Sequence, residues 1–192
     1  APPIINGSET QDFPQTVTLY SANNQGYGYN FCSGTLIASK WVLTAAHCVL
    51  AFDDNEQQGM GNHMVIVGYD LNSRNGVQDY DDVKSWTAHP QYNANSLQND
   101  IGIVELKNGF PNIDPMPVNK TALTQSMVGD DFRYIGWGIT SDNGQDASKK
   151  HYADMPLYDQ ADIVVPIPVS TWICMTASCR PFARPYSGCL LR

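Results

Sequence analysis

Basic residues are scarce in this sequence: 11 lysines and arginines stand against 19 aspartates and glutamates, which gives a net charge of −8 at pH 7. Phosphate backbones and anionic membrane surfaces are bound by clusters of basic side chains. The sequence therefore predicts that the protein binds neither nucleic acid nor a membrane surface. A run of eighteen apolar residues is also absent, so no membrane-spanning helix is expected.

Long helical periodicity is missing as well. Only 16% of the 192 residues are charged and 42% are apolar, while 15 glycines and 12 prolines indicate many turns. This composition favours a globular all-β fold, made of one compact unit or two small ones. The chain shows no signal peptide, and we interpret Ala1-Pro2-Pro3 as a processed or trimmed start.

Metal-ligand spacing is missing among the histidines other than His47. His63, His89 and His151 lie far apart with no paired arrangement, so metal catalysis is not predicted. The five cysteines are an odd number, which leaves at least one thiol without a partner in the chain.

The most informative segment is Thr44-Ala45-Ala46-His47-Cys48, which follows the apolar run Trp41-Val42-Leu43. It resembles the active-site histidine segment of the trypsin/chymotrypsin family of serine peptidases. The resemblance implies that His47 is a general base, a task that suits a side chain with an ordinary pKa near 6.5. The alternative is a structural histidine beside a buried cysteine.

Cys32 lies sixteen positions before Cys48, and the resemblance implies a disulfide between them. Such a bond would hold the loop of His47 against a neighbouring strand, and it favours an oxidising, extracellular setting. Glycosylation sequons begin at Asn6 and Asn119, but triplets of this kind often arise by chance.

Asn99-Asp100-Ile101, preceded by His89-Pro90-Gln91-Tyr92-Asn93, resembles the aspartate segment of the same family. The resemblance implies that Asp100 accepts the Nδ1–H of His47, fixes its tautomer and stabilises the imidazolium. The alternative is an ordinary turn aspartate before a strand. Tyr134-Ile135-Gly136-Trp137-Gly138 resembles a structural strand near the start of the family's second barrel.

Ile4-Ile5-Asn6-Gly7 resembles the N-terminus that family members acquire when a zymogen is cleaved before the first isoleucine. In the family, the amine released at this position pairs with an aspartate next to the catalytic serine. The alternative is a plain N-terminal strand.

The family's Gly-Asp-Ser-Gly-Gly-Pro segment is absent, and Ser187-Gly188 is its best match. Ser187 is therefore the provisional nucleophile. Pro185 falls where a glycine N–H would supply half of the oxyanion hole, and proline has no N–H. Tyr186 replaces the aspartate that would receive the new amine, and Cys189 replaces a small glycine. Cys174 and Cys179, which precede them, have no assigned pairing.

The fold that the resemblance implies is all-β, with two antiparallel six-stranded barrels. We expect residues 1–115 to form the first barrel, which carries His47 and Asp100, and residues 116–192 to form a second, truncated barrel. Segments 53–61 and 70–82 read as acidic loops. Some family members bind calcium in the loop that matches 70–82. In this chain Asp70, Asn72, Asp79 and Asp82 could supply oxygen ligands, but their spacing fits no strict motif and a solvated loop is the favoured interpretation.

The function that follows is that of a secreted serine endopeptidase that cuts peptide bonds through an acyl-enzyme. Its expected partners are protein or peptide substrates and protein protease inhibitors, the expected state is a monomer, and no redox or nucleotide cofactor is implied. The alternative is a catalytically inactive homologue that acts as a binding or inhibitory protein, because the nucleophile segment departs from the family pattern.

Overall fold

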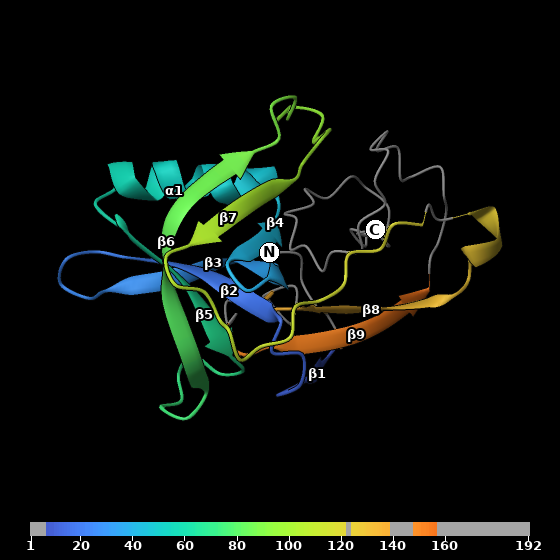
Figure 1. The fold of residues 1–192 in the computed structure, drawn as a ribbon, viewed down its shortest axis with the longest axis horizontal. Helices are drawn as coiled ribbons and strands as arrows, with labels where there is room; N and C mark the ends of the chain where they lie inside the picture. The colour runs from blue at the N-terminus through green and yellow to red at the C-terminus, as the bar shows by residue number, and fades with distance from the viewer. Residues whose placement is uncertain (1–6, 122–123, 139–147, 157–192) are drawn as a thin grey trace.

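The computed structural model describes residues 7–121, 124–138 and 148–156. Six antiparallel strands close into a barrel in the order β2-β3-β4-β7-β6-β5 (Figure 1). They are β2 (Thr16–Ala22), β3 (Gly28–Ala38), β4 (Trp41–Thr44), β5 (Asn62–Gly68), β6 (Val77–Ala88) and β7 (Gly102–Leu106). The all-β prediction is confirmed, and so is the first six-stranded barrel.

Alternating apolar side chains fill the inside of this barrel. Val17 and Leu19 lie two residues apart on β2, and because successive side chains of a strand point to opposite faces, both face the core. They are fully buried, as are Leu36, Val65 and Leu106 from other strands. Burial of each such side chain contributes about 1.5–3 kcal/mol, so the barrel is a rigid support for what its loops carry.

A second, three-stranded sheet has the order β1-β9-β8 and consists of β1 (Ser8–Glu9), β8 (Asp131–Gly136) and β9 (His151–Pro156). A short 3-10 helix, η1 (Gln125–Met127), precedes β8. Arg133 and Asp154 pair across β8 and β9 through two hydrogen bonds of 2.7 and 2.6 Å. The boundary after residue 115 stays a prediction, and residues 157–192 of the expected second barrel lie outside the described residues.

The expectation of a loop at 53–61 was wrong, because α1 (Ala46–Gln57) extends through most of it. The apolar residues Cys48, Val49 and Phe52 give the helix a buried face, and Asn55 continues that face although it is polar. The Asn55 side chain forms hydrogen bonds with residues of the barrel. It can therefore lie at a buried helix position where an amphipathic pattern has an apolar residue. The helix lies outside the barrel, against β6 and β7 (Figure 1).

The expectation of a loop at 70–82 was also partly wrong, because β6 begins at Val77. Asp79 and Asp82 lie three residues apart on this strand, in continuous register with β5, so they point to opposite faces of the sheet. A calcium site in this segment stays the less favoured alternative, and it can take at most one of these two carboxylates as a ligand. Asp82 forms an ion pair with Lys107 at 3.1 Å.

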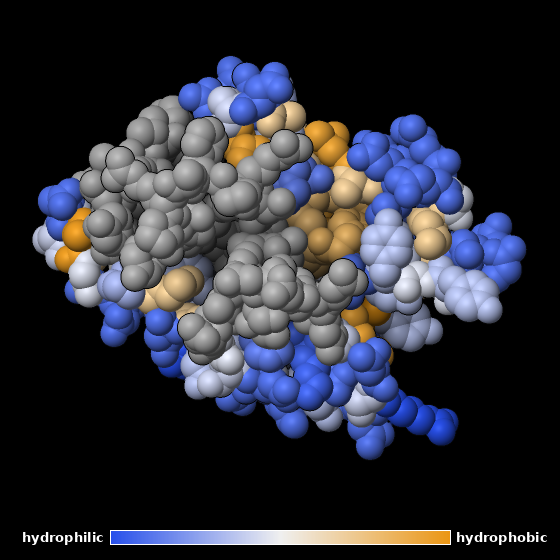
Figure 2. Space-filling view, turned by 180° about the vertical axis from the view of Figure 1, so that it is seen from behind, coloured by the Kyte–Doolittle hydropathy of each residue, from blue (hydrophilic) through white to orange (hydrophobic). Residues whose placement is uncertain are grey.

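Most charged residues that the structure describes lie on the surface, while Asp81 and Lys150 are buried. On the face shown in Figure 2, the residues that the structure describes are mostly hydrophilic. Within the described residues, no helix has the length and apolar character needed to cross a membrane.

Candidate active site

The position of His47 follows from the end of strand β4. That strand pairs with β3 on one side and β7 on the other, and it ends at Thr44, whose Oγ1 donates a 2.8 Å hydrogen bond to the backbone oxygen of Ser33. Ala45 is extended and α1 begins at Ala46, so His47 lies in the first turn of the helix. The chain thus turns from a buried strand into a helix at the edge of the barrel, and the side chain of His47 is 24% exposed.

Asp100 reaches His47 with both carboxylate oxygens. Oδ2 lies 2.7 Å from Nδ1 of the imidazole, and Oδ1 accepts a 2.9 Å hydrogen bond from the backbone N–H of His47. An acceptor at Nδ1 places a proton on that nitrogen, which leaves Nε2 of the neutral ring unprotonated and able to take a proton. The Asp100 side chain is 12% exposed, so the pair is partly shielded from water.

Gly102, the first residue of β7, brings Asp100 this close. A Cβ atom at this position would lie 2.8 Å from the backbone oxygen of Ala45 and 2.8 Å from Cγ2 of Val49. Real Cβ atoms are essentially never found at such distances. The absence of a side chain therefore allows β7 to lie against the start of α1, two residues from Asp100.

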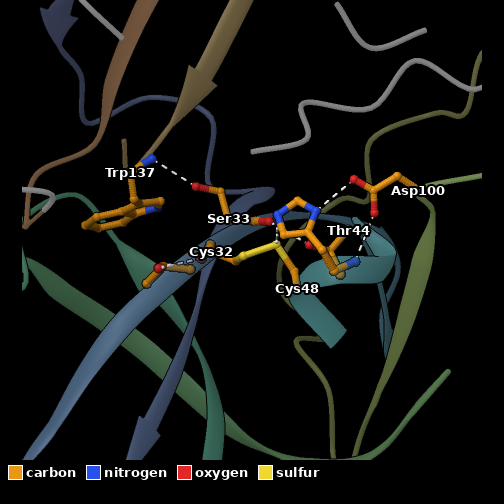
Figure 3. The surroundings of a disulfide bond; sticks show 8 residues. Cys32, Ser33, Thr44, Cys48, Asp100 and Trp137 are labelled. Carbon is orange, nitrogen blue, oxygen red and sulfur yellow. Dashed lines mark hydrogen bonds and ion pairs between the residues drawn. A yellow bond between two sulfur atoms is a disulfide. The ribbon is translucent and has the colours of Figure 1, made fainter. Parts of the chain in front are cut away.

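The predicted disulfide between Cys32 and Cys48 is present, and it joins β3 to α1 (Figure 3). Cys48 Sγ lies 3.4 Å from Nε2 of His47, so the sulfur packs against the ring and limits its rotation. The Cys32, His47 and Cys48 ligand atoms also lie within 4.8 Å of one another. Because the two sulfurs are bonded to each other, neither is the thiolate that a metal ion would require.

Tyr92 is a neighbour of this pair that the sequence pattern did not single out for a role. It is half-buried in the turn before Asp100, where its backbone N–H donates to the oxygen of His89 at 2.9 Å. Burial, and next the negative charge of Asp100, raise the pKa of the Tyr92 phenol. The phenol therefore stays neutral in the physiological range and adds no second negative charge beside the carboxylate.

The structure brings together four of the predicted site residues: Cys32, His47, Cys48 and Asp100. Ser187, the provisional nucleophile, and Ile4, the predicted activation N-terminus, lie outside the described residues. Their roles stay predictions. The close approach at Gly102 was missed, since a glycine after Asp-Ile has no recognisable meaning until the strand it faces is known.

Comparisons with known proteins agree with this geometry. A family profile described as Trypsin matches residues 4–180. Chymotrypsin-like elastase family member 1 from Bos taurus is 30% identical over 184 residues, which cover 82% of this chain and 65% of the relative. Trypsin I-P1 from Gallus gallus is 34% identical over 123 residues, which cover 61% of this chain and 44% of the relative.

The fold has relatives among solved structures too. A structure described as "Structure of GrC" superimposes with a TM-score of 0.66 at 23% identity, and the match covers 81% of this chain and 66% of that chain. This likeness supports a chymotrypsin-like fold. The family match shows that the chain belongs to the trypsin family of serine peptidases. The chain spans about 65% of the length of the elastase relatives that it matches.

Proposed function

We propose that this protein is a serine endopeptidase that works outside the cell, with His47 as general base and Asp100 as the group that orients it. The single observation that carries the proposal is the 2.7 Å contact between His47 Nδ1 and Asp100 Oδ2, in a chain that belongs to the trypsin family. The disulfide beside His47 supports an oxidising compartment.

In the proposed reaction, the hydroxyl of Ser187 attacks the carbonyl carbon of a peptide bond and gives its proton to Nε2 of His47. Asp100 stabilises the imidazolium that forms and stays ionised itself. The imidazolium then donates its proton to the leaving amine, which leaves an acyl-enzyme. Water attacks the ester with His47 again as base. The imidazolium then returns the proton to the serine oxygen, and the carboxylic acid product is released.

The substrates are proposed to be proteins or peptides, as expected for the family, and protein protease inhibitors are the expected competing ligands. Backbone N–H groups near Ser187 would hold the oxyanion. Because Pro185 has no N–H to offer, we expect a slower enzyme than one with both donors; the loss of one donor lowers kcat by roughly 100- to 1000-fold.

Fluorophosphonate labelling tests the proposal on the 192-residue chain. We expect the probe to attach to Ser187, as located by peptide mass spectrometry, and to be lost in His47→Ala and Ser187→Ala variants that keep the wild-type circular dichroism. Label on another serine, still dependent on His47, would overturn the assignment of Ser187 alone.

The rival function is that of a binding or inhibitory homologue without activity. A folded chain that takes up no label and cleaves no protein substrate overturns the catalytic proposal and leaves this rival. His47 and Asp100 favour catalysis, because binding alone has no chemical need for a base oriented by a carboxylate.

A further inference from the structure

A buried serine hydroxyl connects the barrel to the segment that follows β8. Ser33 lies on β3, is 0% exposed, and its Oγ accepts a 2.9 Å hydrogen bond from the backbone N–H of Trp137. Trp137 is 1% exposed and directly follows the last residue of β8. The bond joins residues 104 positions apart and links a side chain of β3 to the backbone of the residue that follows β8.

The same serine is close to the parts that hold His47. Its neighbour Cys32 forms the disulfide to Cys48. The backbone oxygen of Ser33 accepts a hydrogen bond from the hydroxyl of Thr44, three residues before His47. Figure 3 shows Ser33 between Trp137 and the residues around Cys48. One residue therefore contacts both the end of β4, which leads into His47, and the start of the segment after β8.

We propose that Ser33 is a positioning residue, whose hydroxyl sets the distance between the barrel edge that carries His47 and the C-terminal half that carries the nucleophile. The inference rests on the proposed function. In that function the base is in the first barrel and Ser187 is in the second half, and a shift of about 1 Å between reacting groups can lower the rate roughly 100-fold. Removal of the Ser33 hydroxyl would leave the buried N–H of Trp137 without this partner and would loosen the contact at this point, while backbone bonds such as that from Lys150 N–H to Tyr69 O at 2.9 Å still join the two parts elsewhere.

The competing interpretation is that the bond only satisfies a buried polar group. Thr18 provides a matched control, because it is also 0% exposed and its Oγ1 donates a 2.9 Å hydrogen bond to the backbone oxygen of Cys32, the residue next to Ser33. That bond stays within the barrel, between β2 and β3. Ser33→Ala removes the buried hydroxyl that accepts from Trp137, and Thr18→Val removes the buried hydroxyl that donates to Cys32. Of these two bonds, only the first leaves the barrel.

The experiment compares kcat and KM of the two variants with a peptide substrate, at a temperature where circular dichroism shows both to be folded. We expect kcat of Ser33→Ala to fall about tenfold or more with KM within about twofold, because orientation is lost while binding is kept. We expect kcat of Thr18→Val to stay within about twofold. Equal losses in both variants, or none in Ser33→Ala, would overturn the proposal.

Two measurements that need no turnover separate this proposal from the proposed function. Amide hydrogen exchange at Trp137 should accelerate in Ser33→Ala only, and the proton NMR signal of His47 Nδ1–H should shift in Ser33→Ala and stay in place in Thr18→Val. If wild type has no activity but these signals change as stated, the proposed function fails and the role of Ser33 stands. If both variants leave the Nδ1–H signal unchanged, the proposal fails.

Discussion

Both carboxylate oxygens of Asp100 contact one residue, His47. Oδ2 lies against the ring Nδ1, and Oδ1 accepts a hydrogen bond from the backbone N–H. This double contact fixes the ring plane as well as the tautomer. We predict that Asp100→Asn lowers kcat by roughly 10,000-fold with little change in fold, because the amide no longer holds the proton on Nδ1. Steady-state kinetics and circular dichroism measure the two effects.

Asp81 supplies the control for that substitution. It is a buried carboxylate that accepts hydrogen bonds from the backbone N–H groups of Asn108 and Gly109, at 2.8 and 2.6 Å. Burial raises its pKa, but these bonds outweigh burial and the pKa lies below its usual value. Asp81→Asn should lower the free energy of unfolding by about 1–3 kcal/mol and leave kcat of the folded enzyme unchanged. A similar fall in kcat for both variants would show that Asp100 acts only through stability.

Gly102 sets how closely β7 can approach α1. We predict that Gly102→Ala lowers the free energy of unfolding by about 1–3 kcal/mol and also lowers kcat, because the new methyl group meets the backbone of Ala45 and pushes Asp100 away. Gly61→Ala is the matched control, since the nearest atom to its Cβ would be 3.9 Å away. Urea denaturation and kinetics on both variants test this, and a neutral Gly102→Ala would contradict it.

At the scale of elements, α1 is held to the barrel by a chain of polar side chains. Tyr29 donates its hydroxyl to Asn55 at 2.6 Å, Asn55 donates its amide to Ser21 at 3.0 Å, and Ser21 Oγ lies 2.9 Å from Nδ1 of His63. Ser21 Oγ accepts from Asn55 and can bond to His63 Nδ1 either as donor or as acceptor, because a hydroxyl oxygen has two lone pairs and one proton. Nε2 of His63 lies 3.5 Å from Oε1 of Glu56.

This chain of bonds makes the anchoring of α1 sensitive to pH. Burial lowers the pKa of His63, while Glu56 and Asp53 partly raise it again. Below the unfolded value of 6.5 the unfolded chain binds more protons, so the contribution of His63 is present above pH 6.5 and is lost as the pH falls through the lower, folded pKa.

We predict that the free energy of unfolding of wild type, relative to His63→Gln, decreases between pH 7 and about pH 5. Urea denaturation at several pH values measures it, and hydrogen exchange at residues 52–57 should report the same trend in α1. A difference between the two proteins that does not change with pH would show that the neutral ring is not required.

The whole molecule carries a net charge of −8, and its long-range field acts on any charged substrate. We predict that kcat/KM for a peptide with several lysines or arginines falls severalfold between low salt and about 0.5 M salt, because salt screens the attraction. A neutral peptide with the same cleavage site is the control and should change by less than about twofold. The same salt dependence for both peptides would rule out steering by the overall charge.

The sequence predicted the first six-stranded barrel and the His47–Asp100 pair through its resemblance to the trypsin/chymotrypsin family, because short strings around a histidine and an aspartate are local signals. The helix over Ala46–Gln57 was not predicted, and its second half was read as a loop, because Asn55 is polar and its partners come from β2 and β3. The start of β6 was missed because its exposed carboxylates read as a loop.

What the sequence determined by itself was the all-β class, the likeness to the trypsin family, and the identity of His47, Asp100, Cys32 and Cys48. Those are properties of short segments and of composition. The tertiary structure alone decided the closeness of Asp100 to His47 through Gly102, the buried position of Asn55, and the bond from Ser33 to Trp137. Each of these contacts joins residues that are far apart in the sequence. Only the packing of the whole barrel determines how close such residues lie.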